Sequence, residues 1–412
     1  MALNKNLPVY SIVFLFPIVI ATVRDAGGLL YFLLFIFGVT LGWSAWQSLV
    51  AWEKRVLISF CLFFILVNLS FVNNHDMVYG MKKMERYLHF PLVIPMYLLL
   101  KRYAVETGKI YLLGVVVASA VMFGQALYQG YGEVGWRARA IGAYHPIILG
   151  DISMLIAVIC VCALLTLALT WRINLLVALA AALAIIACVM SGSRGAWLLL
   201  PFVVPWFIWI KRKVIGPTMF IVIIVVSTLS ILGALSLDRV EKRVQAAFKE
   251  YQDYSQTSSA SPVGIRLEMW RDSVRIWKEN PLIGTGVGDF KYDRKHFYNK
   301  GESHKGISYV HAHNIYLDVL ATSGLVGIIG MLLLVLIIPF RTFYSFWIRE
   351  TDPWISFYAL SGMVTVVAFA VFGLTETWLA RNAFVRTYLM SIIVFMSSIA
   401  IRKGILNSEL RD

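Results

Sequence analysis

Residues 147–170 read IILGDISMLIAVICVCALLTLALT and contain a single charged side chain, that of Asp151. A helix needs roughly 20 predominantly apolar residues to cross the hydrocarbon core of a bilayer. Lipid offers no water to unpaired backbone groups, so a spanning segment of this kind is expected to be helical. The stretch therefore predicts a transmembrane helix, and the sequence on either side of it repeats the pattern.

The composition of the whole chain agrees with this prediction. Of 412 residues, 59% are apolar and 15% are charged, whereas about 25% of the residues of an ordinary soluble domain are charged. The alternating pattern of an outer-membrane barrel is absent. We expect an all-α polytopic membrane protein with about twelve spans, at residues 7–23, 28–51, 56–72, 87–100, 110–128, 147–170, 173–190, 196–210, 214–235, 314–339, 354–375 and 383–401.

The lysines and arginines beside these spans predict the orientation of the chain. The segments on the side of both termini carry fifteen of them, and the short segments on the other side carry eight. The richer side is expected to be cytoplasmic, so both termini lie inside. The predicted organisation is nine spans in residues 1–235, an outer helical lobe at 236–313, and three spans with a short cytoplasmic tail at 314–412. The net charge of +14 then reflects topology, and we do not read it as nucleic-acid binding.

The four cysteines, Cys61, Cys160, Cys162 and Cys188, all lie in apolar runs, so no disulfide is expected. In the lobe, helical periodicity predicts an amphipathic helix at 238–253, a polar loop at 254–261 and a second helix from Pro262 to about Glu279. The segment LIGTGVG at 282–288 is interpreted as a tight turn with positive φ, because no strand precedes it as in a phosphate loop.

The segment HAHNIYLD at 311–318 lies where the lobe ends and the tenth span begins. His313 is expected in the first turn of that helix, where the partial positive charge of the helix terminus disfavours imidazolium. A neutral imidazole can accept a proton, as a general base must. Two other interpretations remain open. The histidines can be interfacial polar residues, or His304, His311 and His313 can form a zinc site, although no nearby carboxylate or thiolate completes the usual ligand set.

A second candidate element is the outer turn MSGSRGAW at 190–197. Arg194 beside the hydrocarbon core either binds an anion, in a phosphate cradle made with backbone N–H groups, or extends to the interface. Three further arginines on the outer face, Arg137, Arg139 and Arg266, can join such an anion site. Glu376 in the last outer turn either orients His313 or binds the acceptor, or it pairs with Arg381.

No Walker motif is present, and ATP is not expected outside the membrane. An enzyme there must use a substrate that already carries its energy. A lipid-linked pyrophosphate fits this requirement, because arginines can stabilise its anionic leaving group.

Read in order, SGSRGAW, GIRLEMWRDSVRIWKENP, PLIGTGVGDF and HAHNIYLDVLATSGLVG resemble the shared region of the O-antigen ligase and polymerase superfamily, from about Ser191 to Gly330. Length, span number and one dominant outer loop favour the ligase. The resemblance implies a fold related to C-type glycosyltransferases in the bacterial inner membrane, with the active site on the periplasmic face. It implies transfer of a completed glycan from undecaprenyl pyrophosphate to a sugar hydroxyl of the lipid A core, without metal, ATP or other cofactor.

By the same resemblance, His313, Arg194 and Arg266 are the catalytic residues. Further substrate contacts are expected from His311, Arg137, Arg139, Asn314 and Glu376. Two rivals stay open. One is a polymerase or another oligosaccharyltransferase that uses the same donor, and the other is a transporter of lipid-linked glycans. A transporter tends to show inverted repeats and charged residues near mid-span, and we find no convincing repeat.

Overall fold

The computed structural model describes residues 7–103, 106–130, 145–211, 262–301 and 309–409, and these residues fold into helices joined by turns. The predicted all-helical membrane class is confirmed. The α-helices and the shorter 3₁₀ and π helices (η) are α1 Leu7–Val19, α2 Ala26–Phe37, η1 Gly38–Gly42, η2 Trp43–Ser48, α3 Ala51–Asn68, η3 Leu69–Asn73, α4 Met77–Arg102, α5 Thr107–Gly130, α6 Pro146–Thr166, α7 Trp171–Ser191, η4 Gly195–Leu199, α8 Leu200–Lys211, α11 Pro262–Glu279, α12 Phe290–Asn299, α13 Ile315–Gly330, η5 Met331–Ile337, α14 Ile338–Arg349, α15 Pro353–Phe372, η6 Trp378–Ala380 and α16 Asn382–Glu409.

Within the described ranges, eight helical segments are long and apolar enough to cross a membrane. They correspond to the second, third, fifth, sixth, seventh, tenth, eleventh and twelfth predicted spans. The first and eighth predicted spans form the shorter apolar helices Leu7–Val19 and Gly195–Ile210. The ninth, at 214–235, lies outside the described residues, as do the predicted helix at 238–253 and the loop at 254–261.

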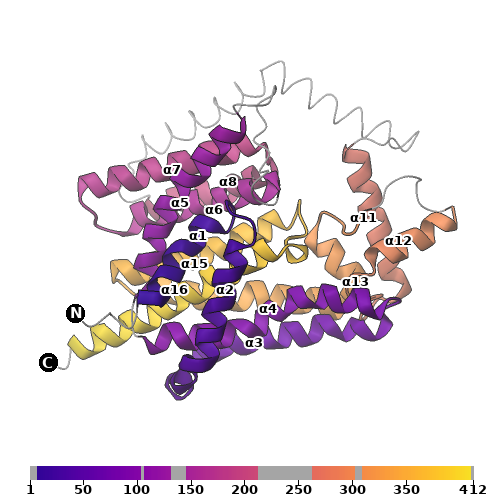
Figure 1. Cartoon of the computed structure of the whole chain (residues 1–412), viewed down its shortest axis with the longest axis horizontal. Coiled ribbons are helices and arrows are strands. Elements are labelled where there is room, and N and C mark those ends of the chain that lie inside the picture. The colour runs from indigo at the N-terminus through magenta and orange to yellow at the C-terminus, as the bar shows by residue number, and fades with distance from the viewer. Residues whose placement is uncertain (1–6, 104–105, 131–144, 212–261, 302–308, 410–412) are drawn as a thin grey trace.

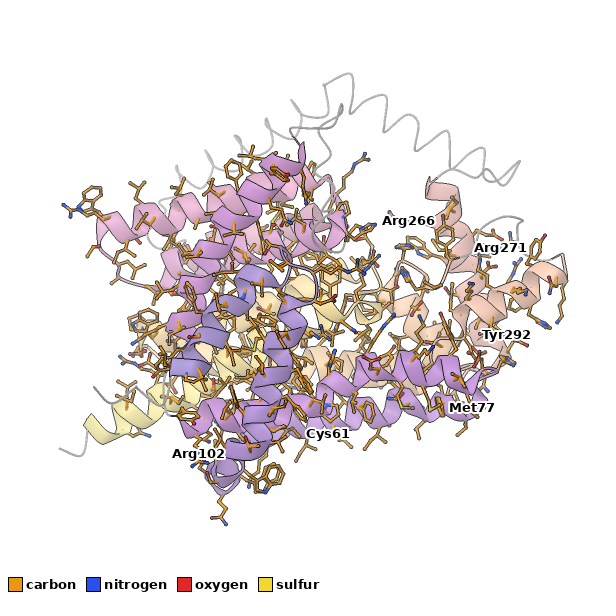
Figure 2. All side chains as sticks on the ribbon, viewed as in Figure 1. Cys61, Met77, Arg102, Arg266, Arg271 and Tyr292 are labelled. Atoms are coloured by element: carbon orange, nitrogen blue, oxygen red, sulfur yellow. The ribbon has the colours of Figure 1, made fainter. Side chains whose placement is uncertain are left out.

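The fourth span differs from the prediction of a short helix at 87–100. Helix α4 has 26 residues and begins at Met77, because the Asp76 carboxylate caps it by accepting a hydrogen bond from the Tyr79 backbone N–H at 2.9 Å. Figure 2 places Met77 and Arg102 at opposite ends of the bundle. At 1.5 Å per residue the helix is about 40 Å long, so its charged first turns extend beyond the apolar part into the lobe end.

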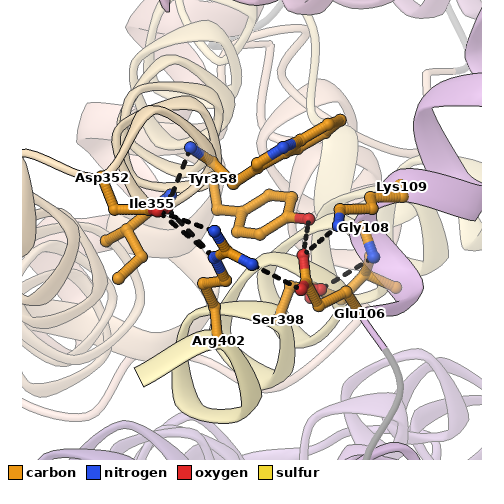
Figure 3. Close-up of polar contacts among 10 residues, drawn as sticks. Glu106, Gly108, Lys109, Asp352, Ile355, Tyr358, Ser398 and Arg402 are labelled. Atoms are coloured by element: carbon orange, nitrogen blue, oxygen red, sulfur yellow. Dashed lines mark hydrogen bonds and ion pairs between the residues drawn. The ribbon is translucent and has the colours of Figure 1, made fainter. Parts of the chain in front are cut away.

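The two ends of the bundle carry different structures. Helices α11 and α12 form the lobe at one end, and the last turns of α16 lie at the other (Figure 1). At that other end, an ion pair joins Arg402 Nη2 to Asp352 Oδ2 at 2.9 Å, and the Tyr358 hydroxyl donates to Glu106 at 3.0 Å (Figure 3). These contacts connect the residues that open α5 and α15 to the end of α16. All four cysteines are free, as predicted.

The lobe has its own small core. Met269 and Ile276 of α11 are buried with Phe290 and Phe297 of α12, and Ala312 and Ala321 complete the cluster. The predicted helix from Pro262 to Glu279 is confirmed. The lobe is thus packed directly against the segment between His311 and the tenth span.

The glycine-rich turn 282–288 joins the lobe to the membrane part. The prediction of positive φ is confirmed at Gly284 (79°), Gly286 (141°) and Gly288 (91°). Helix α13 is broken at Gly324, and the freed backbone N–H of Leu325 donates to the Pro281 carbonyl at 2.9 Å. The two glycine-bearing backbones touch, because a Cβ on Gly284 would lie 2.3 Å from the Thr322 carbonyl carbon. The glycine-rich turn therefore packs against the break in α13 and satisfies a backbone group that the break leaves free.

Candidate active site

The backbone at His313 is held in an unusual conformation. His313 has φ +49°, a left-handed conformation that L-residues rarely adopt. The prediction that His313 lies in the first turn of the helix is wrong, because Asn314 is the N-cap and His313 precedes it. The side-chain oxygen of Asn314 accepts hydrogen bonds from the backbone N–H groups of Tyr316 at 3.0 Å and Leu317 at 3.1 Å. Such strain is typical of functional sites.

The loop between α15 and α16 is hydrogen-bonded to the start of α13. The backbone N–H of Ile315 donates to the Gly373 carbonyl at 2.8 Å, and the Asn314 side-chain amide donates to the Leu374 carbonyl at 3.3 Å. Both groups of the Asn314 side chain are thus used within the protein. Its predicted role in substrate binding stays a prediction.

Glu376, which follows in the same loop, joins the two parts of the site. Its Oε2 lies 3.2 Å from His313 Nδ1, and its Oε1 accepts from Arg381 Nε at 3.1 Å. Its side chain is 1% exposed. The sequence leaves open whether Glu376 contacts His313 or pairs with Arg381, and in the structure its carboxylate contacts both side chains.

The electrostatics of this histidine–glutamate cluster (His311, His313 and Glu376) favour a charged carboxylate. Burial opposes ionisation of Glu376, but the hydrogen bond from His313 and the charge of Arg381 lower its pKa to about 2. A carboxylate only accepts hydrogen bonds, so His313 Nδ1 carries the proton. The Nε2 atom of a neutral His313 is then the acceptor, which is the arrangement of a general base with an orienting acid.

His311 is held in its neutral form. Burial, together with the nearby cationic groups, lowers its pKa to about 4. Its Nε2 lies 4.0 Å from Glu376 Oε1. Because His311 is neutral near pH 7, this contact is not an ion pair at that pH. Within the described parts of the chain, its buried Nδ1 has no hydrogen-bond partner. The predicted substrate contact of His311 stays a prediction.

The cluster also has a donor set that could hold a metal. One ligand atom from each of the three side chains lies within 4.8 Å of the other two. No carboxylate is expected near these histidines from the sequence, and the position of Glu376 shows that this expectation is wrong. His304, the third predicted ligand, lies outside the described residues. The Arg381 guanidinium on Oε1 already neutralises the carboxylate, which disfavours a bound cation there.

The turn that bears Arg194 lies beside the same loop. A Cβ on Gly195 would meet the Thr375 hydroxyl at 2.4 Å, and Thr375 immediately precedes Glu376. On the other side of the turn, the Ser193 hydroxyl donates to Asp151 at 3.0 Å. The Arg194 side chain is exposed. The structure therefore brings the predicted Arg194 turn to the loop that carries Glu376.

Arg266 is placed on the lobe. Its side chain is exposed on α11, in the half of the helix that precedes Arg271 (Figure 2). Met269, one turn along the helix, packs in the lobe core with Ala312, which lies between the two histidines. No contact between Arg266 and His313 is formed among the described side chains. Arg137 and Arg139 lie outside the described residues.

Two cationic residues near the cluster were not selected from the sequence. Arg381 was considered only as a partner for Glu376, although it sits on the carboxylate that holds His313. The spans expected at 56–72 and 87–100 leave Arg86 in a loop, but it is half-buried on α4 and its charge helps lower the pKa of His311. Asp76, as a helix N-cap residue, is the sequence feature that could have predicted a helix reaching Arg86.

The position of the histidine pair also depends on a buried acid. Asp318 Oδ1 accepts a hydrogen bond from the Ala312 backbone N–H at 2.9 Å. Asp318 lies one turn inside α13, so the contact folds the HAH segment back over the helix start. Asp318 is therefore a positioning residue for the histidine pair, and its sequence position alone does not predict this role.

Comparison with known proteins supports the family resemblance of the sequence motifs. An uncharacterised protein of Haemophilus influenzae is 24% identical over 351 residues, which cover 84% of this chain and 86% of the relative. A family model described as O-antigen ligase matches residues 179–332, a range that includes the Arg194 turn, the described lobe helices, the glycine-rich turn and the histidine pair. The family resemblance of the sequence motifs is thus confirmed, because residues 179–332 match the O-antigen ligase family model.

Proposed function

We propose that this protein is an O-antigen ligase. It transfers a completed glycan from undecaprenyl pyrophosphate to a sugar hydroxyl of the lipid A core, on the periplasmic face of the inner membrane. The observation that carries the proposal is the Glu376–His313 contact of 3.2 Å at the start of a membrane span. A base oriented in this way is what activation of a weakly acidic sugar hydroxyl requires.

In the proposed reaction, His313 Nε2 removes the proton of the acceptor hydroxyl as its oxygen attacks the anomeric carbon. The bond from that carbon to the pyrophosphate oxygen breaks in the same displacement, and the configuration inverts. The electron pair leaves on the pyrophosphate. Glu376 stabilises the imidazolium that forms, and general base catalysis of this kind contributes about 10²–10⁴-fold.

The leaving group gains negative charge, which cationic side chains on the accessible side can stabilise. Arg194 lies beside the Glu376 loop, and Arg266 lies on the helix that packs against Ala312. Both are exposed, as a residue that meets a diffusing lipid carrier must be. They form the proposed pyrophosphate clamp.

The test is a transfer assay in proteoliposomes that contain the purified protein, a pyrophosphate-linked glycan donor and a lipid A-core acceptor. The proposal expects glycan to appear on the acceptor. Elongation of one lipid-linked glycan by another would instead identify a polymerase, and movement of donor without reaction would identify a transporter. Glycan profiles of a deletion strain give an independent readout, because loss of a ligase leaves long chains on the lipid carrier.

We also propose that the transfer needs no metal. The carboxylate of the histidine–glutamate cluster is neutralised by Arg381 at 3.1 Å. Treatment with EDTA, followed by removal of the chelator, is expected to leave the transfer rate unchanged. Loss of transfer that zinc restores would contradict this and would assign the three ligand atoms to a metal.

A further inference from the structure

A second site lies at the end of the bundle that is remote from His313. The span that starts at Ile315 beside the active site continues for 35 residues to Arg349. Arg341 lies in its last part, well beyond the break at Gly324. Here a cavity of about 900 Å³ opens between α3 and the η5–α14 segment. We call it the basic cavity, and the reaction proposed above makes no use of it.

The wall that η5 and α14 supply changes character along one helical face. Leu333, Leu334, Ile337 and Ile338 line its first part. Arg341, Ser345 and Arg349 follow at intervals of three or four residues and line its second part. A gradient from apolar to cationic along a membrane helix matches the passage from acyl chains to headgroups.

The charge of the cavity is not balanced by the protein. Its lining holds four cations, of which Lys403 pairs with the single lining acid, Glu350, at 2.5 Å. For Arg55, Arg341 and Arg349, no carboxylate within 4.0 Å is found in the part of the chain that the structure describes. Three arginines on one apolar recess attract an anion that also has an apolar part.

The recess is held in shape by its neighbours. Residues Met331–Ile337 form a π helix, which widens the backbone, and such segments are frequent at functional sites. The Leu334 carbonyl accepts from the Ser59 hydroxyl of α3 at 2.8 Å, and the Val335 carbonyl accepts from the Tyr388 hydroxyl. The cavity is therefore built into the packing of three helices.

We propose that the basic cavity binds an anionic phospholipid. The acyl chains lie along Leu333 and Ile337, which are 47% and 43% exposed, and the headgroup phosphate meets Arg341, Arg349 and Arg55. A soluble anion would leave the apolar wall unused, and a zwitterionic lipid would leave the arginines uncompensated. Basic recesses between membrane helices on the side predicted here to be cytoplasmic suit such headgroups.

The test is native mass spectrometry of the full-length protein released from detergent, with phosphatidylglycerol or phosphatidylethanolamine added. The wild type is expected to retain one phosphatidylglycerol in preference to phosphatidylethanolamine. The Arg341→Gln, Arg349→Gln double variant is expected to bind phosphatidylglycerol about 30-fold more weakly, which is about 1 kcal/mol for each arginine. A control with the same charge loss outside the cavity, Lys54→Gln with Arg172→Gln, is expected to bind as the wild type does.

A second variant guards against loss of folding. Ser345→Trp fills the recess and keeps every arginine, so it is expected to lose the bound lipid at an unchanged melting temperature. Equal retention of the two lipids by the wild type overturns the proposal, and so does undiminished phosphatidylglycerol binding by both variants. Displacement of phosphatidylglycerol by millimolar inorganic phosphate overturns the lipid assignment in favour of a soluble anion.

Discussion

The Glu376→Gln substitution examines the contact on which the proposed chemistry depends. Glutamine keeps the shape of the side chain and removes its charge. At 3.2 Å and an effective dielectric constant of about 20, a carboxylate stabilises the imidazolium formed during proton transfer by about 5 kcal/mol. Arg381 offsets part of this attraction. We therefore expect the barrier to rise by about 3–4 kcal/mol, or about 10²–10³-fold in rate.

The substitution also acts on the tautomer. The glutamine amide can donate to His313 Nδ1, which leaves the ring proton on Nε2, where the acceptor hydroxyl must bind. The assay is single-turnover transfer in proteoliposomes at saturating donor and acceptor, with Glu376→Asp as the variant that keeps the charge. Glu350→Gln, which removes a carboxylate at the remote end of the bundle, is the matched control.

Thermal melting in detergent separates chemistry from folding, because the variant leaves Arg381 without its carboxylate. We expect the Gln variant to melt near the wild type and to lose at least about 10²-fold in rate. If a well-folded Glu376→Gln protein transfers glycan as fast as the wild type, Glu376 does not orient a catalytic base.

Three further outcomes follow from the structure. Gly284→Ala places a Cβ 2.3 Å from a backbone atom, and we expect it to lower the free energy of unfolding by about 2 kcal/mol or more. Gly301→Ala has a similar φ but open space around the Cβ, and we expect it to lower that free energy by about 1 kcal/mol. Equal melting temperatures of the two variants would contradict the close approach at Gly284. The pKa of His311 falls from 6.5 to about 4 on folding, so the unfolded chain binds more protons between these values and stability decreases as the pH drops from about 6.5 towards 4. His311→Gln is expected to flatten that part of the melting-temperature curve, and an unchanged curve would show that His311 is not buried as a neutral ring. The Arg194→Ala, Arg266→Ala double variant is expected to weaken donor affinity by at least about 10²-fold, and normal donor affinity measured by titration would remove the pyrophosphate clamp.

Much of the membrane architecture can be predicted from the sequence because its signals are local. Apolar length predicts the spans, and Pro262 with Asn280-Pro281 predicts both ends of α11. The fourth span was predicted too short because charged residues at 82–86 hide the first turns of a helix whose cap lies further back, at Asp76. The π helix at Met331–Ile337 leaves no pattern that hydropathy detects.

The site could be predicted only in part, for a related reason. The HAH segment and the Arg194 turn are short motifs, so they are visible in one stretch of sequence. The contact of His313 with Glu376 joins residues 63 positions apart, and no spacing rule predicts it. The left-handed backbone of His313 and the position of Arg86 beside the cluster likewise follow from packing between distant helices.

In the proposed reaction, His313 accepts the proton of a sugar hydroxyl during glycan transfer from a lipid pyrophosphate. The most direct measurement is the single-turnover transfer rate of a His313→Ala variant in proteoliposomes, with donor binding and melting temperature determined on the same preparation. We expect a rate at least about 10²-fold lower, with donor binding retained. Transfer at the wild-type rate would contradict it.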